Sequence, residues 1–348
     1  MFFLIVAVMK PTDFSKYLSN FLTKYLSGER GVSSNTILAY KDSFLLFVTF
    51  MQNVKGIKPE RLELKSVTKD IVVEYLDWIQ SQRHCNNNTR NARLAALHSF
   101  FRYLQYQDLE NLHEWQKILS IRIKTSRQET VNYLTLDGIK LLLEGPDTRT
   151  RKGRRDLALL SLMYDSGARV QEMADLVPAM LKLEYPCTIK LIGKGNKARI
   201  VPLMDAQVKF LRSYISENKL LEPYANMYPL FFNSRKEKLT RAGINYILLK
   251  YVNIAKAKGT QFLPNKISCH SLRHSKAMHL LQSGVNLVYI RDILGHVSVK
   301  TTEIYARADS LKKREALQKA YSDVLPNETP VWLIKDGLLE WLKRFSSK

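Results

Sequence analysis

The chain has 348 residues, 45% of them hydrophobic, and its 54 Lys and Arg outnumber 32 Asp and Glu to give a formal net charge of +22. That length accommodates two domains with hydrophobic cores, and the hydrophobic share excludes an intrinsically disordered chain. The excess of positive charge favours a polyanionic partner, either nucleic acid or an anionic membrane surface.

Residues 1–11 form an apolar N-terminal tail. Its uninterrupted apolar run, Met1–Met9, is shorter than the roughly 20 residues that a membrane-spanning helix needs, and it lacks the basic start of a secretory signal. The three cysteines include no Cys-x-x-Cys pair, which is typical of a reducing compartment. We therefore expect a cytoplasmic protein with no membrane partner.

Residues 12–119 show the apolar spacing of amphipathic helices. Apolar side chains recur at i, i+3, i+4 and i+7, and polar residues precede each run. This pattern predicts a compact helical domain with short joints. The four expected helices contain Phe14–Tyr25, Ile37–Val48, Ile71–Ile79 and Leu94–Leu104.

The fourth of these helices also carries polar residues that we place away from its apolar stripe, namely Arg90, Arg93, His98 and Arg102. Such a face is either simply solvated or laid against DNA. Both interpretations stay open, and Arg90 and Arg93 are candidate DNA contacts.

Residues 120–132 lose the apolar periodicity and are predicted to form a basic linker, after which residues 133–325 form a second domain. Thr135 is placed to cap its first helix. A strongly apolar helix over Asp156–Tyr164 ends at Ser166-Gly167, just before Arg169. A C-terminal extension, 326–348, begins with the chain break Pro326–Pro330 and is predicted to include a short amphipathic helix over Val331–Phe345.

A β-hairpin interrupts the helical pattern of this second domain. Residues 188–192 and 198–203 read as strands around the glycine-containing turn Gly193–Lys197. The Gly-Lys-Gly segment lacks the spacing of a nucleotide-binding phosphate loop. The fold class is therefore mainly α with one small β-hairpin or sheet.

Charged and phenolic residues of the second domain suit a phosphodiester substrate. Arginine offers planar, bidentate donors to phosphate oxygens, and tyrosine can act as a covalent nucleophile. The set comprises Arg169, His270, Arg273, His296 and Tyr305.

Cys269 adjoins His270, and His274 follows four residues later, so these three side chains are candidate metal ligands. The chain has no His-Glu-x-x-His motif and no second Cys/His cluster at finger spacing, so we expect neither a metal nor another cofactor. His274 and His279 are interpreted as structural.

These motifs resemble the signature of the tyrosine recombinase (phage integrase) family. The resemblance covers about residues 12–325 and includes Arg169, His270-x-x-Arg273, Leu294-Gly295-His296, Tyr305 and the hairpin with Ile192–Lys197, which is similar to that of Xer-like members. It implies a helical core-binding (SAM-like) domain followed by a mostly helical catalytic domain of the DNA breaking-rejoining type.

The resemblance also implies a role for each residue. Arg169, His270, Arg273 and His296 would contact the scissile phosphate, and Tyr305 would be the nucleophile. Lys194 would protonate the leaving oxygen, with Lys197 and Arg199 as nearby competitors that otherwise contact DNA. Glu172 would support the Arg169 region.

The implied activity is site-specific DNA recombination through a 3′-phosphotyrosyl intermediate. We expect integration or excision of a mobile element, either a transposon or a phage; Xer-like chromosome-dimer resolution, a type IB-like topoisomerase and a DNA-binding protein with a decayed site are the alternatives. The expected partners are double-stranded DNA, three further copies of the chain on two DNA sites, and accessory recombination proteins.

Overall fold

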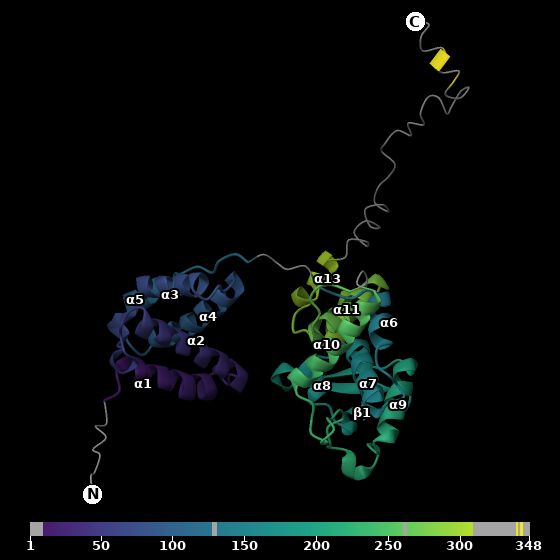
Figure 1. Cartoon of the computed structure of the whole chain (residues 1–348). Helices are drawn as coiled ribbons and strands as arrows, with labels where there is room; N and C mark the ends of the chain where they lie inside the picture. The colour runs from purple at the N-terminus through teal and green to yellow at the C-terminus, as the bar shows by residue number, and fades with distance from the viewer. Residues whose placement is uncertain (1–9, 127–130, 260–262, 309–338, 340–341, 344–348) are drawn as a thin grey trace. The chain divides into compact units, whose positions relative to one another are not determined.

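The structure, a computed structural model, describes residues 10–126, 131–259 and 263–308, together with 339, 342 and 343. The chain divides into two compact units, Met1–Glu129 and Thr130–Lys348 (Figure 1). The division lies within the segment predicted as a linker. Most of the N-terminal tail and all but three residues of the C-terminal extension lie outside the described residues.

The first unit is helical, as predicted. Three of its helices begin directly after polar residues that cap them. The side chains of Thr12, Thr68 and Asn86 each accept a hydrogen bond from a backbone N–H in the first turn of the helix that follows. The elements are α1 (Asp13–Asn20), which continues as the π-helical segment η1 (Phe21–Glu29), α2 (Ser34–Asn53), the 3₁₀ turns η2 (Pro59–Arg61) and η3 (Leu64–Ser66), α3 (Lys69–Ser81), α4 (Asn87–Leu104) and α5 (Leu112–Leu119).

Helix α5 was not predicted. It is short, and only Trp115 and Ile118 are buried within it, so its apolar pattern covers less than one full repeat. Trp115 packs on Phe101 of α4 with ring centroids 5.1 Å apart. The core of this unit is rich in aromatic side chains, and Phe21, Phe44 and Phe100 contact one another edge to face.

The prediction that Arg90 and His98 lie on a polar face of α4 was wrong. Arg90 is 4% exposed and His98 is buried with its Nε2 atom 3.1 Å from the carbonyl of Ile118. Arg90 lies four residues before Leu94 and seven before Leu97, so it falls on the apolar stripe rather than opposite it. Arg93 is half-buried and donates to the hydroxyl of Ser43.

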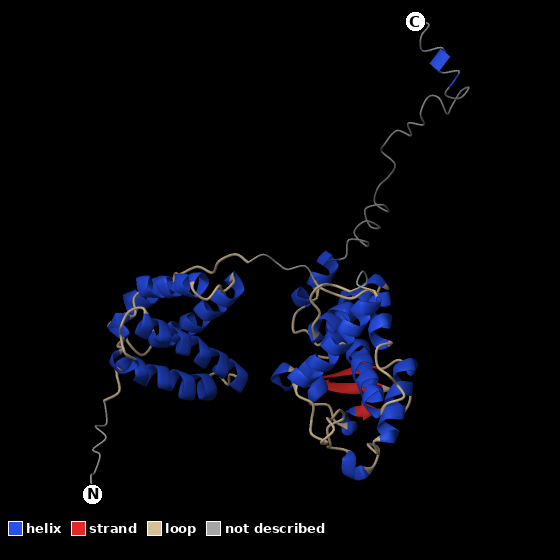
Figure 2. Cartoon of the chain, in the orientation of Figure 1, coloured by secondary structure: helices blue, strands red, loops and turns tan. Residues whose placement is uncertain are grey.

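The second unit is mostly helical around a small sheet (Figure 2). Its long helix α7 packs along α9 and α11, and α10 packs along α6. The helices are α6 (Leu136–Leu143), α7 (Arg151–Ser166), α8 (Val170–Ala174), α9 (Asp205–Glu217), α10 (Arg241–Lys258), α11 (Cys269–Gln282), α12 (Leu287–Leu294) and α13 (Glu303–Ala308).

The sheet confirms the predicted hairpin and adds a strand to it. Strands β2 (Thr188–Ile192) and β3 (Ala198–Pro202) pair antiparallel, with Lys190 opposite Ile200. The very short β1 (Leu181–Lys182) extends the order to β1-β2-β3. The connection between β2 and β3 is a tight turn, Lys194–Asn196, in which Gly195 and Asn196 have left-handed backbone angles.

Two glycines end helices at the points that position the site. Gly167 ends α7 and Gly295 ends α12, each with a left-handed backbone conformation that side chains other than glycine's adopt at a cost. Gly295 is followed directly by His296, and Gly167 lies two residues before Arg169. Within the described ranges, no helix is long and apolar enough to cross a membrane.

Candidate active site

The turn after α7 places Arg169 at the start of α8, where the carboxylate of Glu172 accepts hydrogen bonds from it. The backbone N–H of Arg169 donates to Glu172 Oε2 at 2.7 Å, and its Nη1 donates to Glu172 Oε1 at 2.9 Å. Glu172 is 5% exposed. Glu172 therefore binds both the backbone and the guanidinium of Arg169.

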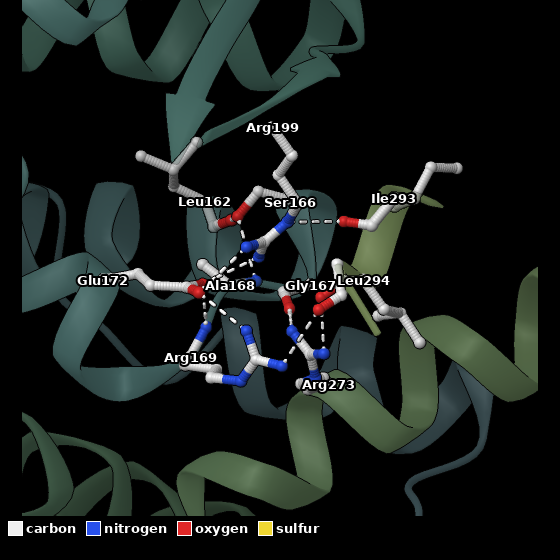
Figure 3. A network of polar contacts seen from close by, with 11 residues as sticks. Leu162, Ser166, Gly167, Ala168, Arg169, Glu172, Arg199, Arg273, Ile293 and Leu294 are labelled. Carbon is white, nitrogen blue, oxygen red and sulfur yellow. Dashed lines mark hydrogen bonds and ion pairs between the residues drawn. The ribbon is translucent and has the colours of Figure 1, made fainter. Parts of the chain in front are cut away.

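The end of α12 binds three guanidiniums through three consecutive backbone carbonyls (Figure 3). Arg199 Nε donates to the carbonyl of Ile293 at 2.8 Å, Arg273 Nη2 to that of Leu294 at 2.6 Å, and Arg169 Nη2 to that of Gly295 at 3.3 Å. The last carbonyls of a helix have no partners within the helix and carry its partial negative charge. This helix end therefore draws together cations from three separate elements.

Arg273 is almost fully buried, at 2% exposure, and its Nη1 also donates to the carbonyl of Gly167 at 2.8 Å. Burial, together with the charges of Arg169 and Arg199, lowers the pKa of its guanidinium to about 10. It therefore stays charged at neutral pH.

Arg199 was predicted as a DNA contact or a competing general acid, and the structure places it otherwise. Its Nη1 and Nη2 donate to the two carboxylate oxygens of Glu172 at 2.8 and 2.7 Å, and its side chain is 10% exposed. Every nitrogen of this guanidinium has a partner inside the protein.

Glu172 remains ionised between the two arginines. Burial by itself would raise the pKa of the Glu172 carboxyl, but hydrogen bonds from Arg199 and Arg169 outweigh burial, and the pKa lies below its usual range.

Tyr305 lies on α13, which packs on α11. The phenol is 1% exposed, and its oxygen is 3.0 Å from Nδ1 of His274. The ring of His296 is parallel to it, with centroids 6.5 Å apart. Burial raises the pKa of Tyr305, against the charges of Arg273 and Arg169, so the phenol is protonated at neutral pH.

The contact of His274 with Tyr305 was missed by the sequence analysis, which interpreted His274 as structural. Its position gave a signal, because His274 follows His270 by one helical turn and their rings are in edge-to-face contact at 5.6 Å. His279, also interpreted as structural, is hydrogen-bonded to the phenol of Tyr164 at 2.9 Å.

The three histidines of the site are neutral at neutral pH. Burial, reinforced by neighbouring arginines and histidines, lowers the pKa of His274 and of His296 to about 4, and burial with Arg273 and Arg169 also lowers that of His270. His296 is oriented by Thr302, whose hydroxyl oxygen is 3.0 Å from its Nδ1. The arginines therefore supply the positive charge, and the imidazoles remain able to accept protons.

An open cleft of about 830 Å³ lies over this cluster. Its lining includes Arg169, Arg199 and His296 together with exposed Lys197 and Ala198 from the hairpin. Lys194 begins the turn at the hairpin tip, but its side chain lies outside what the structure describes. Among the described residues, no group of three or more His, Cys, Asp or Glu side chains is arranged to hold a metal.

Comparison with known proteins gives the same division of the chain. Residues 132–312 match the model of the phage integrase family, and residues 20–108 match that of the phage integrase N-terminal SAM-like domain. The two matches correspond to the second and the first structural unit.

Relatives match along most of their length. A putative integrase/recombinase y4rC of Sinorhizobium fredii is 33% identical, over 89% of this chain and 92% of the relative. Tyrosine recombinase XerD of Listeria monocytogenes is also 33% identical, over 85% of this chain and 95% of its own.

Solved structures share the fold. The XerH recombinase, in a post-cleavage complex with its difH substrate, superposes with a TM-score of 0.67 at 24% identity, covering 86% of this chain and 84% of XerH. The Tn1549 transposon integrase with transposon-end DNA gives 0.66 at 15% identity, covering 87% and 97%. The chain belongs to the phage integrase family and is a tyrosine-type site-specific DNA recombinase.

Proposed function

We propose that this recombinase breaks and rejoins DNA strands through a covalent bond between Tyr305 and a 3′ phosphate. The observation that carries the proposal is the meeting of Tyr305 and His296 with Arg169 and Arg273, which come from distant parts of the sequence. Two guanidiniums beside a phenol suit the charge that develops when an oxygen attacks a phosphodiester.

In the proposed cleavage step, the phenol oxygen of Tyr305 forms a bond to phosphorus while the bond to the 5′ oxygen breaks. Arg169 and Arg273 hold the non-bridging oxygens. His270 contacts the phosphate and accepts the phenol proton, and His296 donates a hydrogen bond to the phosphate or the leaving oxygen. Lys194 protonates the leaving oxygen.

Rejoining reverses these steps with the 5′ hydroxyl of a partner strand. The phosphotyrosine bond conserves the energy of the broken bond, so strand exchange needs neither ATP nor a metal.

The partner proposed for the cleft is double-stranded DNA. The net charge of +22 supports this, and so do solved structures of similar fold that contain DNA. Lys197 at the cleft and half-buried Arg93 remain proposed contacts to the DNA backbone. Arg90 and Arg199 do not, because Arg90 is buried and Arg199 is paired with Glu172. A complete exchange engages four copies on two sites in the cytoplasm, with accessory proteins as further partners.

The biological role we propose is integration or excision of a mobile element, supported by the similarity to the y4rC integrase/recombinase. Xer-type resolution of chromosome dimers is the second candidate, because XerD of Listeria monocytogenes is equally similar. Sequencing the genomic fragments that the purified protein cleaves distinguishes the two, since the sites would flank a mobile element in one case and lie once per chromosome in the other.

The chemistry is tested with a nicked suicide substrate. Cleavage releases a short fragment that carries the 5′ hydroxyl, and because this fragment diffuses away, the strand cannot be resealed and the covalent adduct accumulates. Wild type and a Tyr289→Phe control, whose exposed tyrosine lies on α12, should form the adduct, and Tyr305→Phe should not. An adduct with Tyr305→Phe, or none with wild type, overturns the assignment.

A further inference from the structure

Arg199 joins three elements of the candidate active site, and every nitrogen of its guanidinium already has a partner within the protein. It lies on β3 of the hairpin that carries Lys194, it bridges both carboxylate oxygens of Glu172, and it binds the carbonyl of Ile293 at the end of α12. A guanidinium with its donors fixed in one plane is suited to such a triple contact, and an ammonium is not.

The contact with Glu172 extends to Arg169. The same carboxylate accepts from the backbone and the Nη1 of Arg169, so the position of the carboxylate decides where that guanidinium points. Without Arg199, Glu172 would be a buried carboxylate with one cation instead of two, and both its position and that of Arg169 would be free to change.

The contact with α12 extends to His296. Arg199 packs so closely on Gly295 that a Cβ there would lie 2.9 Å from Arg199 Cδ and 3.1 Å from its Nη1. The residue that follows Gly295 is His296, so the side chain of Arg199 fixes the hairpin against the turn that presents this histidine.

We propose that Arg199 is a positioning residue for strand cleavage, which aligns Arg169 through Glu172 and holds the Lys194 hairpin against the His296 turn. The proposal rests on the proposed function of this site. Misplacing a reacting group by about 1 Å costs on the order of 100-fold in rate. Loss of Arg199 should therefore slow cleavage by about 100-fold while leaving DNA affinity unchanged.

The test compares single-turnover cleavage at saturating DNA by full-length wild type, Arg199→Met and Arg199→Lys. Lys190→Met serves as the matched control, because Lys190 is an exposed cation on the neighbouring strand of the same hairpin. Arg199→Met should be slow, Arg199→Lys intermediate and Lys190→Met like wild type. Thermal unfolding and DNA binding of each variant are measured alongside.

A second substrate separates positioning from general damage. A methylphosphonate at the scissile position lacks one charged oxygen, so its cleavage depends less on Arg169, and the defect of Arg199→Met should shrink on it. In combination with Glu172→Gln, the two substitutions should cost less than the product of their separate effects. If Arg199→Met does not fold, the comparison of the two substrates is made with Arg199→Lys.

The outcomes separate the inference from the function on which it rests. Cleavage by Arg199→Met at the wild-type rate, or an equal defect on both substrates, overturns the role of Arg199 alone. Failure of wild type to form a Tyr305 adduct overturns the proposed function, and the role of Arg199 with it.

Discussion

Substituting Gly295 with alanine tests how tightly the end of α12 is packed. Its φ of +64° means that alanine would be strained, at roughly 1–2 kcal/mol. An added Cβ would also lie 2.9 Å from Arg199 Cδ and displace that side chain. Weakening the charged hydrogen bonds of Arg199 costs about 1.5–3 kcal/mol. Gly295→Ala should therefore lose about 3–4 kcal/mol of unfolding free energy.

Gly284 provides the matched control. Its φ is +88°, but an added Cβ would meet nothing within 4 Å, so Gly284→Ala reports the backbone strain alone. For a domain of this size roughly 2–4 °C is lost per kcal/mol, which predicts a fall in Tm of about 4 °C for Gly284→Ala and about 10 °C for Gly295→Ala.

The assay is thermal unfolding of the full chain followed by circular dichroism, with cleavage of the suicide substrate measured on the same preparations. Gly295→Ala should also cleave slowly, because Arg199 is displaced, whereas Gly284→Ala should cleave normally. Equal losses of Tm in the two variants would refute the reasoning, since they would mean that the space beside Gly295 accommodates a methyl group without moving Arg199.

Three further predictions concern buried polar contacts. Tyr251→Phe removes a 2.8 Å hydrogen bond to the fully buried Asp156 carboxylate. It should lower the unfolding free energy, measured by urea denaturation, by about 1–3 kcal/mol, and an unchanged value would contradict this. The pKa of Glu172 is lowered in the folded chain, so its ionised carboxylate contributes to the unfolding free energy above the usual carboxyl pKa of 4.5. This contribution is lost as the pH falls through the lowered pKa. The Tm of Glu172→Gln, measured as a function of pH, should therefore converge with that of wild type in acid. His274→Phe removes the partner of the Tyr305 phenol and should slow single-turnover cleavage by about ten-fold, with His274→Gln closer to wild type; a full rate for His274→Phe would exclude a role for this contact.

Much of the fold could be predicted because its signals are local. Caps such as Thr135, helix-ending glycines such as Gly167, and the apolar alternation of the hairpin all depend on residues near one another in sequence. Helix α5 was missed because eight residues carry too little periodicity to stand out.

The site was harder to predict wherever a side chain finds its partner far along the chain. His274 pairs with Tyr305 only because α13 packs on α11, which no local pattern reveals. Arg199 was taken for a surface cation by its charge. Strand alternation places it on the face of Val201, which is buried, and this signal could have indicated an internal partner.

The acceptors at the end of α12 are main-chain oxygens, and this decides which sequence changes the site tolerates. Substituting Ile293 or Leu294 changes a side chain but cannot delete the carbonyl that binds an arginine. The vulnerable feature is the path of the backbone, which depends on Gly295. Anyone transplanting this arrangement into another scaffold would have to copy a helix ending before copying any arginine.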